Sequence, residues 1–337
     1  MFELVFFFQI IVIGLIVGTI VITVFKQNKL QDKKRDLAKN NEFIEKNRAK
    51  YEQIINSNAA SIADERKGYK KNGIIFAILV IIPLLLYFVT MQIVFIFLFP
   101  VVIIVGGIIF GKKANAYITK SKRMYEEIAQ DILKDLDSNL EYYPNRGYSY
   151  QEYSLLYFYE DCDRFTSEDM IVSNKTSFCT ADIKVESEHE DDDGHTSYVT
   201  EYDGSLAKIN IKNVGCTIIL GGLSKLAFRR SDVFTKIMFE HDEFNKQFLC
   251  FTDNELTAYK VLTPDIMEEL VHIKKNTIGD IEVRIINDEL YIRFRGTNGF
   301  DGREDSKEEL FSSVAVLEEI MKTMNRIKEI VERKTMD

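Results

Sequence analysis

The sequence predicts a membrane protein in which three transmembrane α-helices precede a cytoplasmic α+β domain with a mainly antiparallel sheet. Three observations lead to this prediction. Gly73 to Phe110 is a run of thirty-eight residues without a charged side chain. Leu4 to Phe25 is a second apolar run, of about twenty residues. From about Tyr150 the sequence changes to short alternating runs that are typical of strands, with helical patterns between them.

The central run is too long for one membrane crossing. As a single helix it would extend roughly 57 Å, nearly twice the roughly 30 Å hydrocarbon core of a bilayer. Its most polar residues, Val89 to Gln92, lie in the middle. We therefore expect two transmembrane helices that form a hairpin over residues 73–111, with kinks at Pro83 and Pro100. The alternative is a buried helix pair in a soluble core, which is disfavoured because such helices show a polar face.

The first apolar run is interpreted as an uncleaved transmembrane helix within residues 1–25. A signal peptide would have a positive start and a small-residue cleavage site, whereas this chain begins Met-Phe-Glu. Lysines follow this run but do not precede it, and lysines flank both ends of the hairpin. The positive-inside rule therefore predicts a multi-pass protein of the cell membrane, with its N-terminus outside and its C-terminal domain in the cytoplasm.

The remaining segments are assigned by their periodicity. Residues 26–72 predict a cytoplasmic helical linker that turns at Asn56 to Asn58, and residues 112–147 predict an amphipathic connecting helix that ends at the turn Pro144 to Gly147. Residues 148–337 are expected to form the α+β domain, because strands and helices mix there without a steady βαβ alternation.

Six strands and two main helices are expected in this domain. Asp193-Gly194 is a hairpin signal between the first two strands, and Thr263-Pro264 is the start signal of a helix over 265–275, with Thr263 as its N-cap. A long terminal helix is expected over 308–333. The expected strands are 177–188, 198–213, 216–220, 247–252, 281–286 and 290–294.

Charge and cysteine content restrict the class of partner. The net charge is -9, but Lys26 to Asn72 contains thirteen Lys and Arg against seven Asp and Glu, whereas Tyr150 to Asn210 contains four against fifteen. The basic segment favours a lipid bilayer with anionic headgroups as a partner, and the acidic region disfavours nucleic acid. The four cysteines show no CxxC spacing and are interpreted as free thiols in a reducing compartment.

Two clusters of polar residues are candidate sites of chemistry. The densest contains Glu186, Glu188, His189, Glu190, Asp191 to Asp193 and His195. Consecutive carboxylates on an extended hairpin point to alternate sides, so a solvated acidic tip is favoured, and cation binding near Asp191 to Asp193 is left open. Asp161 to Asp169 around Arg164 is interpreted as an ion-paired loop.

The remaining candidate functional residues are histidines and glycines. His241 and His272 are assigned packing or surface roles, and Gly221-Gly222 and Gly296 to Gly299 are assigned to turns. No HExxH, Walker A, GxGxxG or GxSxG motif occurs. The sequence therefore predicts no catalytic residue, no cofactor and no metal ligand.

Several segments resemble a known family. They include Leu140 to Pro144 with Gly147, Asp163 to Met170 and Ala181 to Glu186, and the most specific are Glu243 to Glu268 and Leu290 to Ile292. Through them the region from Arg123 to Glu332 is similar to the bacterial domain of unknown function 3137, which is usually found behind paired membrane helices. The resemblance implies the fold and membrane association and transfers no catalytic residue. Gly204 to Ala207 departs from the phenylalanine-rich run expected there.

These observations favour a non-catalytic protein whose cytoplasmic domain binds or scaffolds a protein partner at the membrane. One alternative is a membrane-tethered, metal-assisted enzyme that uses the carboxylates of Glu186 to Asp193 or Asp161 to Asp169. A transporter component is a weaker alternative, because the expected spans contain no ionisable residue. The sequence assigns neither the partner nor an oligomeric state.

Overall fold

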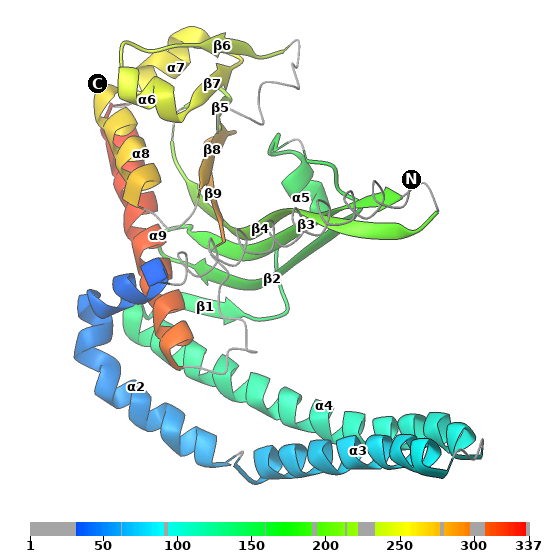
Figure 1. Cartoon of the computed structure of the whole chain (residues 1–337). Coiled ribbons are helices and arrows are strands. Elements are labelled where there is room, and N and C mark those ends of the chain that lie inside the picture. The colour runs from blue at the N-terminus through cyan, green and yellow to red at the C-terminus, as the bar shows by residue number, and fades with distance from the viewer. Residues whose placement is uncertain are drawn as a thin grey trace. The chain divides into compact units, whose positions relative to one another are not determined.

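The computed structural model describes residues 32–61, 63–90, 94–158, 160–190, 194–212, 214–221, 233–276, 280–296 and 307–334 (Figure 1). The chain divides into two compact units. Unit 1 comprises residues 1–45, 133–300 and 308–337, and unit 2 comprises residues 46–132 and 301–307.

Unit 1 is built on one antiparallel sheet, with nine strands in the described part of the chain. Their spatial order is β1-β2-β3-β4-β9-β8-β5-β7-β6. Each neighbouring pair is antiparallel. The strands are β1 (Leu140–Tyr143), β2 (Arg164–Ser173), β3 (Cys179–Glu190), β4 (Thr196–Asn210), β5 (Ile218–Gly221), β6 (Thr235–Ile237), β7 (Leu249–Thr252), β8 (Ile281–Ile286) and β9 (Glu289–Arg295).

The central strands β8 and β9 show why the sheet has two different faces. Side chains alternate along a strand, so residues two apart share a face. Ile281 pairs with Phe294 and Val283 with Ile292, which makes one face aliphatic and aromatic. On the opposite face, Glu282 pairs with Arg293. The charged face is also covered, because Arg293 is buried.

Two helices cover the apolar face. They are α8 (Pro264–Asn276) and α9 (Lys307–Lys334), which lie beside each other in Figure 1 and are joined by an ion pair between Glu269 and Arg326 at 2.9 Å. The buried residues of α9 recur at the helical period and include Phe311, Val314, Leu317, Ile320, Met324, Ile327 and Val331. Two shorter helices, α6 (Asp242–Gln247) and α7 (Glu255–Val261), flank β7 in the chain.

The segment between β1 and β2 covers the charged face. It contains the short helix α5 (Tyr150–Ser154), which begins with a capping box formed by Ser149 and Glu152. Figure 1 shows α5 on the opposite side of the sheet from α9. Its buried cluster with the sheet comprises Tyr148, Tyr153, Leu156, Phe158, Met170, Ala181, Ile183, Val185, Tyr202, Leu206 and Tyr291.

Most of the expected elements of this unit are present. The strands expected over 177–188, 198–213, 216–220, 247–252, 281–286 and 290–294 correspond to β3, β4, β5, β7, β8 and β9, and the two expected helices to α8 and α9. The expected ion-paired loop around Arg164 is wrong, because Arg164–Ser173 is β2, and β1 and β6 were not expected. Thr263 Oγ1 has no hydrogen-bond partner among the described residues, so the expected cap of α8 is not formed.

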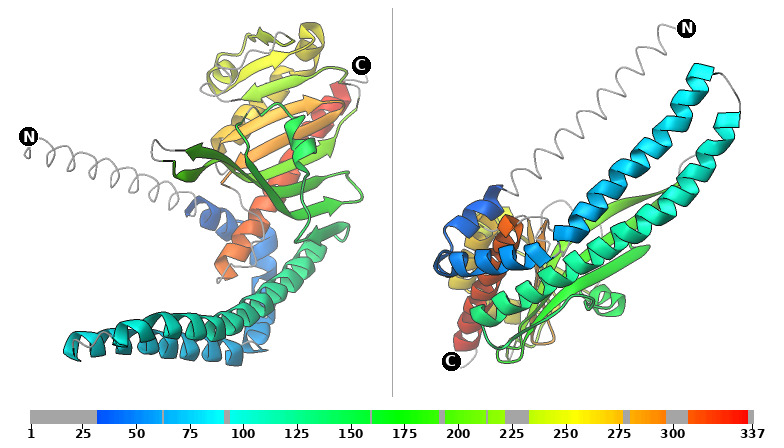
Figure 2. Two further views of the ribbon diagram at one scale, coloured as in Figure 1. Left: turned by 90° about the vertical axis from the view of Figure 1, so that its right-hand side faces the viewer. Right: turned by 90° about the horizontal axis from the view of Figure 1, so that it is seen from below.

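Unit 2 is helical in its described part. It contains most of α2 (Glu42–Ser61), all of α3 (Ala63–Thr90) and most of α4 (Val94–Leu136). Both panels of Figure 2 show α3 and α4 side by side. The turn expected at Asn56 to Asn58 is wrong, because α2 continues through it. The break in the helical region lies upstream instead, between residues 32–39 and α2, where Asn41 caps the start of α2: its Oδ1 accepts a hydrogen bond from the Ile44 N–H at 3.0 Å.

An aromatic seam joins α3 to α4. The Tyr69 ring stacks on Phe110 and on Tyr117, each with 5.4 Å between ring centroids, and Phe76 stacks on Phe110 at 5.7 Å. Gly106 faces Phe76 so closely that an added Cβ would lie 2.7 Å from the Phe76 ring. The two helices are therefore packed through aromatic side chains, with glycine where the contact is closest.

The structure overturns the predicted transmembrane architecture. A search of the described residues found no helix with the length and apolar character required to cross a membrane. The expectation counted the uncharged run alone, but α3 begins ten residues earlier, among Asp64, Glu65, Arg66 and Lys67, and α4 continues to Leu136 through charged turns. The predicted multi-pass location, with an outside N-terminus and a cytoplasmic domain, depended on those spans and is overturned with them. The first expected span, within residues 1–25, lies outside the described residues.

Candidate binding pocket

The acidic cluster selected from the sequence lies on the β3–β4 hairpin, where its side chains contact one another and their neighbours. Glu186 forms ion pairs with Lys184 at 2.6 Å and with Arg164 at 3.9 Å. Glu188 Oε2 accepts a hydrogen bond from the Tyr198 hydroxyl at 3.0 Å. In the described part of the chain no three His, Cys, Asp or Glu side chains are grouped so that they would hold a metal ion. Asp191 to Asp193 lie outside the described residues.

The other candidate residues are dispersed. His241 caps α6, with Nδ1 accepting from the Phe244 N–H at 3.1 Å, and His272 lies on the exposed side of α8.

All four cysteines are free thiols, as predicted. Burial raises the pKa of Cys216 to about 11. Gly221 ends β5 and Gly296 adopts φ +76°, whereas Gly222 and residues 297–299 lie outside the described residues.

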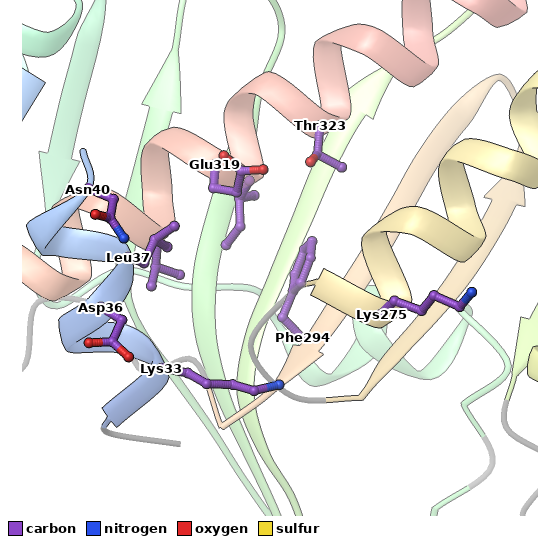
Figure 3. A pocket seen from close by; sticks show the side chains of 10 residues that line it. Lys33, Asp36, Leu37, Asn40, Lys275, Phe294, Glu319 and Thr323 are labelled. Carbon is purple, nitrogen blue, oxygen red and sulfur yellow. The ribbon is translucent and has the colours of Figure 1, made fainter. Parts of the chain in front are cut away.

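The structure contains a pocket that the sequence did not predict. It has a volume of about 420 Å³ and lies within unit 1 between the helical residues 32–40, the end of α8, β9 and α9 (Figure 3). Its described lining residues are Lys33, Asp36, Leu37, Asn40, Lys275, Phe294, Val316, Glu319, Ile320 and Thr323. Residues that are far apart in the sequence therefore share one cavity.

The floor of the pocket is apolar. Phe294 belongs to the apolar face of β9 and is fully buried, and Val316 and Ile320 lie one turn apart on α9. Leu37 contributes the opposite wall from the N-terminal helical residues. A buried apolar surface of this kind binds aliphatic or aromatic groups.

The rim of the pocket is charged and solvent-exposed. Lys33 and Asp36 come from one side and Glu319 from the other. Figure 3 shows the Lys33 side chain extending toward the Phe294 side of the cavity, whereas the Lys275 amine points away from it. Lys275 forms an ion pair with Glu243 of α6. The described lining residues include no His or Cys and one hydroxyl, that of Thr323, so they form no nucleophile–base pair.

One hydrogen bond fixes the N-terminal wall of the pocket. Asn41 Nδ2 donates to Glu318 Oε2 of α9 at 2.6 Å. Asn41 Oδ1 also accepts a hydrogen bond from the Ile44 N–H, so the same side chain caps the start of α2 and attaches this point of the chain to α9. The pocket is therefore held by a specific polar contact as well as by apolar packing.

A buried arginine pair on the opposite face of the sheet was also missed in the sequence. Arg284 of β8 donates to the carbonyls of Leu156 at 3.1 Å and Leu220 at 2.8 Å. Arg293 of β9 donates to the Tyr153 hydroxyl at 2.7 Å and to Glu282 at 2.8 Å. These bonds attach the segment around α5 to the centre of the sheet.

Aromatic rings complete this cluster. The Arg293 guanidinium lies 4.0 Å from the centroid of Phe158 and 4.4 Å from that of Tyr202. Burial lowers the pKa of Arg284 to about 10. Burial would also lower the pKa of Arg293, but Glu282 and other neighbours raise it well above its ordinary value. Both arginines are therefore cations at neutral pH, and the cluster is interpreted as a structural support.

Comparison with known proteins identifies the C-terminal part of the chain. Residues 204–333 match a family model described as a protein of unknown function, DUF3137. Over these residues the chain is similar to the DUF3137 family. The DUF3137 region includes Glu243 to Glu268 and Leu290 to Ile292, on which the resemblance mainly depended, whereas the segments between Leu140 and Glu186 precede it. It also includes Phe294 and all the pocket residues of α9.

Two further comparisons add little to the DUF3137 assignment. None of the curated proteins matches the chain. Among solved structures, the crystal structure of the mycobacterial trehalose monomycolate transport factor A is 9% identical, with a TM-score of 0.32, over 60% of this chain and 95% of that chain. A likeness at this TM-score supports no conclusion about function.

Proposed function

We propose that this chain is a non-catalytic protein that binds a protein partner, and that the pocket beside α9 receives an apolar side chain of that partner. The observation that carries the proposal is the apolar floor of Phe294, Val316 and Ile320 inside a charged, exposed rim. Protein interfaces have the same arrangement, with a desolvated apolar centre and a polar edge.

The size of the pocket suits an anchoring side chain. Its volume of about 420 Å³ is within the range of roughly 300–1,000 Å³ typical of ligand pockets, and it would hold one or two large apolar side chains. The floor is buried in the free chain. A partner side chain would therefore lose its water on entry, which is the condition under which single residues dominate binding.

The rim would select and orient the partner. Lys33 and Glu319 carry opposite charges on opposite sides of the cavity, so an acidic group near Lys33 and a basic group near Glu319 would be favoured. Both side chains are exposed, so each such contact would contribute at most about 1 kcal/mol and would act mainly on specificity.

Neither alternative function gains support. In the described residues the carboxylates proposed for a metal-assisted enzyme belong to hairpin contacts, as shown by Glu186 with Lys184. The transporter alternative required the transmembrane helices that the structure overturns. Partner binding is the function that the pocket supports best.

Photo-crosslinking tests the proposal. A photoreactive amino acid at Glu319, on the exposed rim, should yield the same crosslinked protein in repeated experiments, identified by mass spectrometry. Thr323→Trp should remove this product, because Thr323 lines the cavity and an indole would fill it. Lys322→Trp is the matched control, because Lys322 is the adjacent residue of α9 but lies outside the pocket and is exposed.

Two results would contradict the proposal. One is a crosslinked product that Thr323→Trp and Lys322→Trp affect equally, because binding would then not depend on the pocket. The other is substrate turnover by the purified chain in the absence of any partner.

A further inference from the structure

The β3–β4 hairpin extends beyond both of its neighbouring strands (Figure 1). The pairing of β3 with β2 ends at Glu186 and the pairing of β4 with β9 ends at Gly204, whereas β3 and β4 pair with each other out to Glu190 and Thr196. In the described part of the chain, residues 196–202 of β4 therefore have a strand on one side only. Such an edge presents backbone N–H and C=O groups with which another strand can pair.

Two hydrogen bonds mark where this open edge begins. Gly296 N–H donates to the Asp203 carbonyl at 2.8 Å, and Arg295 Nη2 donates to the Glu201 carbonyl at 2.9 Å. At Glu201 a side chain, and not a strand, therefore occupies the edge. The residues beyond it, Thr196 to Thr200, are exposed. An ordinary strand has about five to six residues, so residues 196–202 are long enough to pair with one added strand.

One face of the hairpin is rich in carboxylates. Residues two apart in a strand share a face, so Glu186, Glu188 and Glu190 of β3 lie on the same one. Glu186 forms ion pairs with Lys184 and Arg164. Glu188 and Glu190 are exposed and are in excess over these two cations. This face of the hairpin is therefore negative.

The strand β4 contributes a different exposed side chain to each face. Tyr198 lies on the negative face, where its hydroxyl donates to Glu188 at 3.0 Å and its ring lies 3.9 Å from the Arg164 guanidinium. Val199 lies on the opposite face and is 47% exposed. A strand added beside β4 would place alternate side chains against the carboxylates and against this valine.

The charge of the hairpin selects the partner. Residues 185–207 contain eight Asp and Glu and no Lys or Arg. Pairing of this edge with the same edge of a second copy would bring two acidic hairpins together, and like charges on neighbouring strands are destabilising. Lys or Arg side chains on the added strand would instead be attracted to the negative face.

We propose that residues 196–202 of β4 pair with an extended segment of a protein partner in which Lys or Arg residues alternate with aliphatic residues. The basic side chains of the partner lie on the face of Glu188 and Glu190, and its aliphatic side chains pack beside Val199. None of these hairpin residues lines the pocket beside α9, so this second surface does not depend on the function proposed for that pocket.

Hydrogen exchange of the full chain with a probe peptide tests this pairing. The probe is the hexapeptide Lys-Val-Lys-Val-Lys-Val, acetylated and amidated at its ends. At saturation it should slow amide exchange in residues 196–202 about tenfold or more, because the added strand accepts hydrogen bonds from the open edge. Exchange in the edge strand β6 should not change, because β6 lies at the far end of the sheet.

Two matched peptides separate backbone pairing from attraction between charges. The peptide Glu-Val-Glu-Val-Glu-Val should bind roughly tenfold more weakly, because its carboxylates face those of the hairpin. The Lys-Val peptide methylated at every backbone nitrogen keeps its charges but donates no backbone hydrogen bond, so it should not protect residues 196–202. Both comparisons use the unmodified chain and so do not depend on the folding of a variant.

A charge reversal tests the negative face. Glu190→Lys should weaken binding of the Lys-Val peptide about two- to fivefold, because contacts between exposed charges are weak. Glu240→Lys is the matched control, because it makes the same change of charge at an exposed residue outside the hairpin. It should leave binding unchanged.

Four results would overturn the proposal. The Lys-Val peptide fails to protect residues 196–202, the Glu-Val peptide or the methylated peptide protects them equally well, or the two charge reversals weaken binding equally. The fourth is protection of residues 196–202 that rises with chain concentration in the absence of peptide, because a second copy would then occupy the edge.

Discussion

Glu160 and Arg293 form an almost completely buried ion pair, with 2.8 Å between Glu160 Oε2 and Arg293 Nη1, although they lie 133 positions apart in the sequence. Glu160 belongs to the segment that follows α5, and Arg293 lies on the central strand β9. The pair therefore joins a segment outside the DUF3137 match to a strand inside it. Removal of Arg293 would leave the Glu160 carboxylate buried without this cation, whereas removal of Glu160 would leave Arg293 paired with Glu282.

Arg293→Met tests this role. Methionine keeps most of the side-chain length but leaves the buried Glu160 without Arg293, and it leaves Glu282 paired with Arg284 alone. Loss of one partner of a buried pair costs about 3–5 kcal/mol, so the free energy of unfolding should fall by about this amount. Urea denaturation would measure the change.

Lys208→Met is the matched control for the buried pair. Lys208 and Glu289 also lie 2.8 Å apart on neighbouring strands, but each is 29% exposed. Solvent screening limits such a pair to about 1 kcal/mol, so this variant should be much less destabilised. Equal losses in both variants would show that the buried cluster has no special role.

Gly204→Ala should also destabilise the sheet. Gly204 of β4 has φ +158°, and an added Cβ would collide with the Phe294 carbonyl oxygen of the paired strand. Gly215→Ala is the comparison, because Gly215 has φ +62° but no atom within 4 Å of the added Cβ. We expect about 1 kcal/mol for backbone strain alone at Gly215 and clearly more at Gly204. Similar urea midpoints for the two variants would contradict the collision.

Local patterns were sufficient to predict much of unit 1. The turn signal of Asp193-Gly194 and alternating side chains indicated β3 and β4, and the helical period indicated α9. The strand β2 was not expected, because the charged residues Asp163, Arg164 and Glu168 suggested an ion-paired loop. In the structure this stretch pairs with β3, and the register shifts between Glu168 and Ile171, where Asp169 has φ +58°.

Local sequence patterns could not predict the candidate pocket. The pocket combines Lys33 with Thr323, and only the tertiary fold brings such distant residues together. Arg284 and Arg293 alternate with apolar residues along β8 and β9. A strand with one solvent-exposed face shows the same alternation of polar and apolar residues. Their burial depends on the segment around α5 that covers them. The uncharged run alone is a misleading guide, because α3 begins before it and α4 continues beyond it.

Tyr142→Phe should weaken the contact at the β2 bulge. The Tyr142 hydroxyl donates to Asp169 Oδ1, and both residues are buried. A hydrogen bond to a buried charged group contributes about 1.5–3 kcal/mol, so the free energy of unfolding should fall by this order. Tyr143→Phe removes a hydrogen bond to Glu141 that is solvent-exposed, and it should change stability by less than about 0.5 kcal/mol. The same loss in both variants would count against a buried contact.

The thiol of Cys216 should make stability depend on alkaline pH. Burial, followed by the charge of Asp253, raises its pKa to about 11 in the folded chain, whereas an unfolded cysteine has a pKa of about 8.5. Between these values the unfolded chain loses a proton that the folded chain keeps, so stability falls as pH rises. Below about pH 8 the contribution is fully present.

Cys216→Ala isolates this effect, because all other titrating groups are shared with the unmodified chain. Urea midpoints of the two proteins should differ by a constant amount up to about pH 8, and the unmodified chain should then lose up to roughly 3 kcal/mol more than the variant by about pH 11. Parallel pH profiles across this range would mean that the Cys216 thiol is not shielded from solvent in the folded protein.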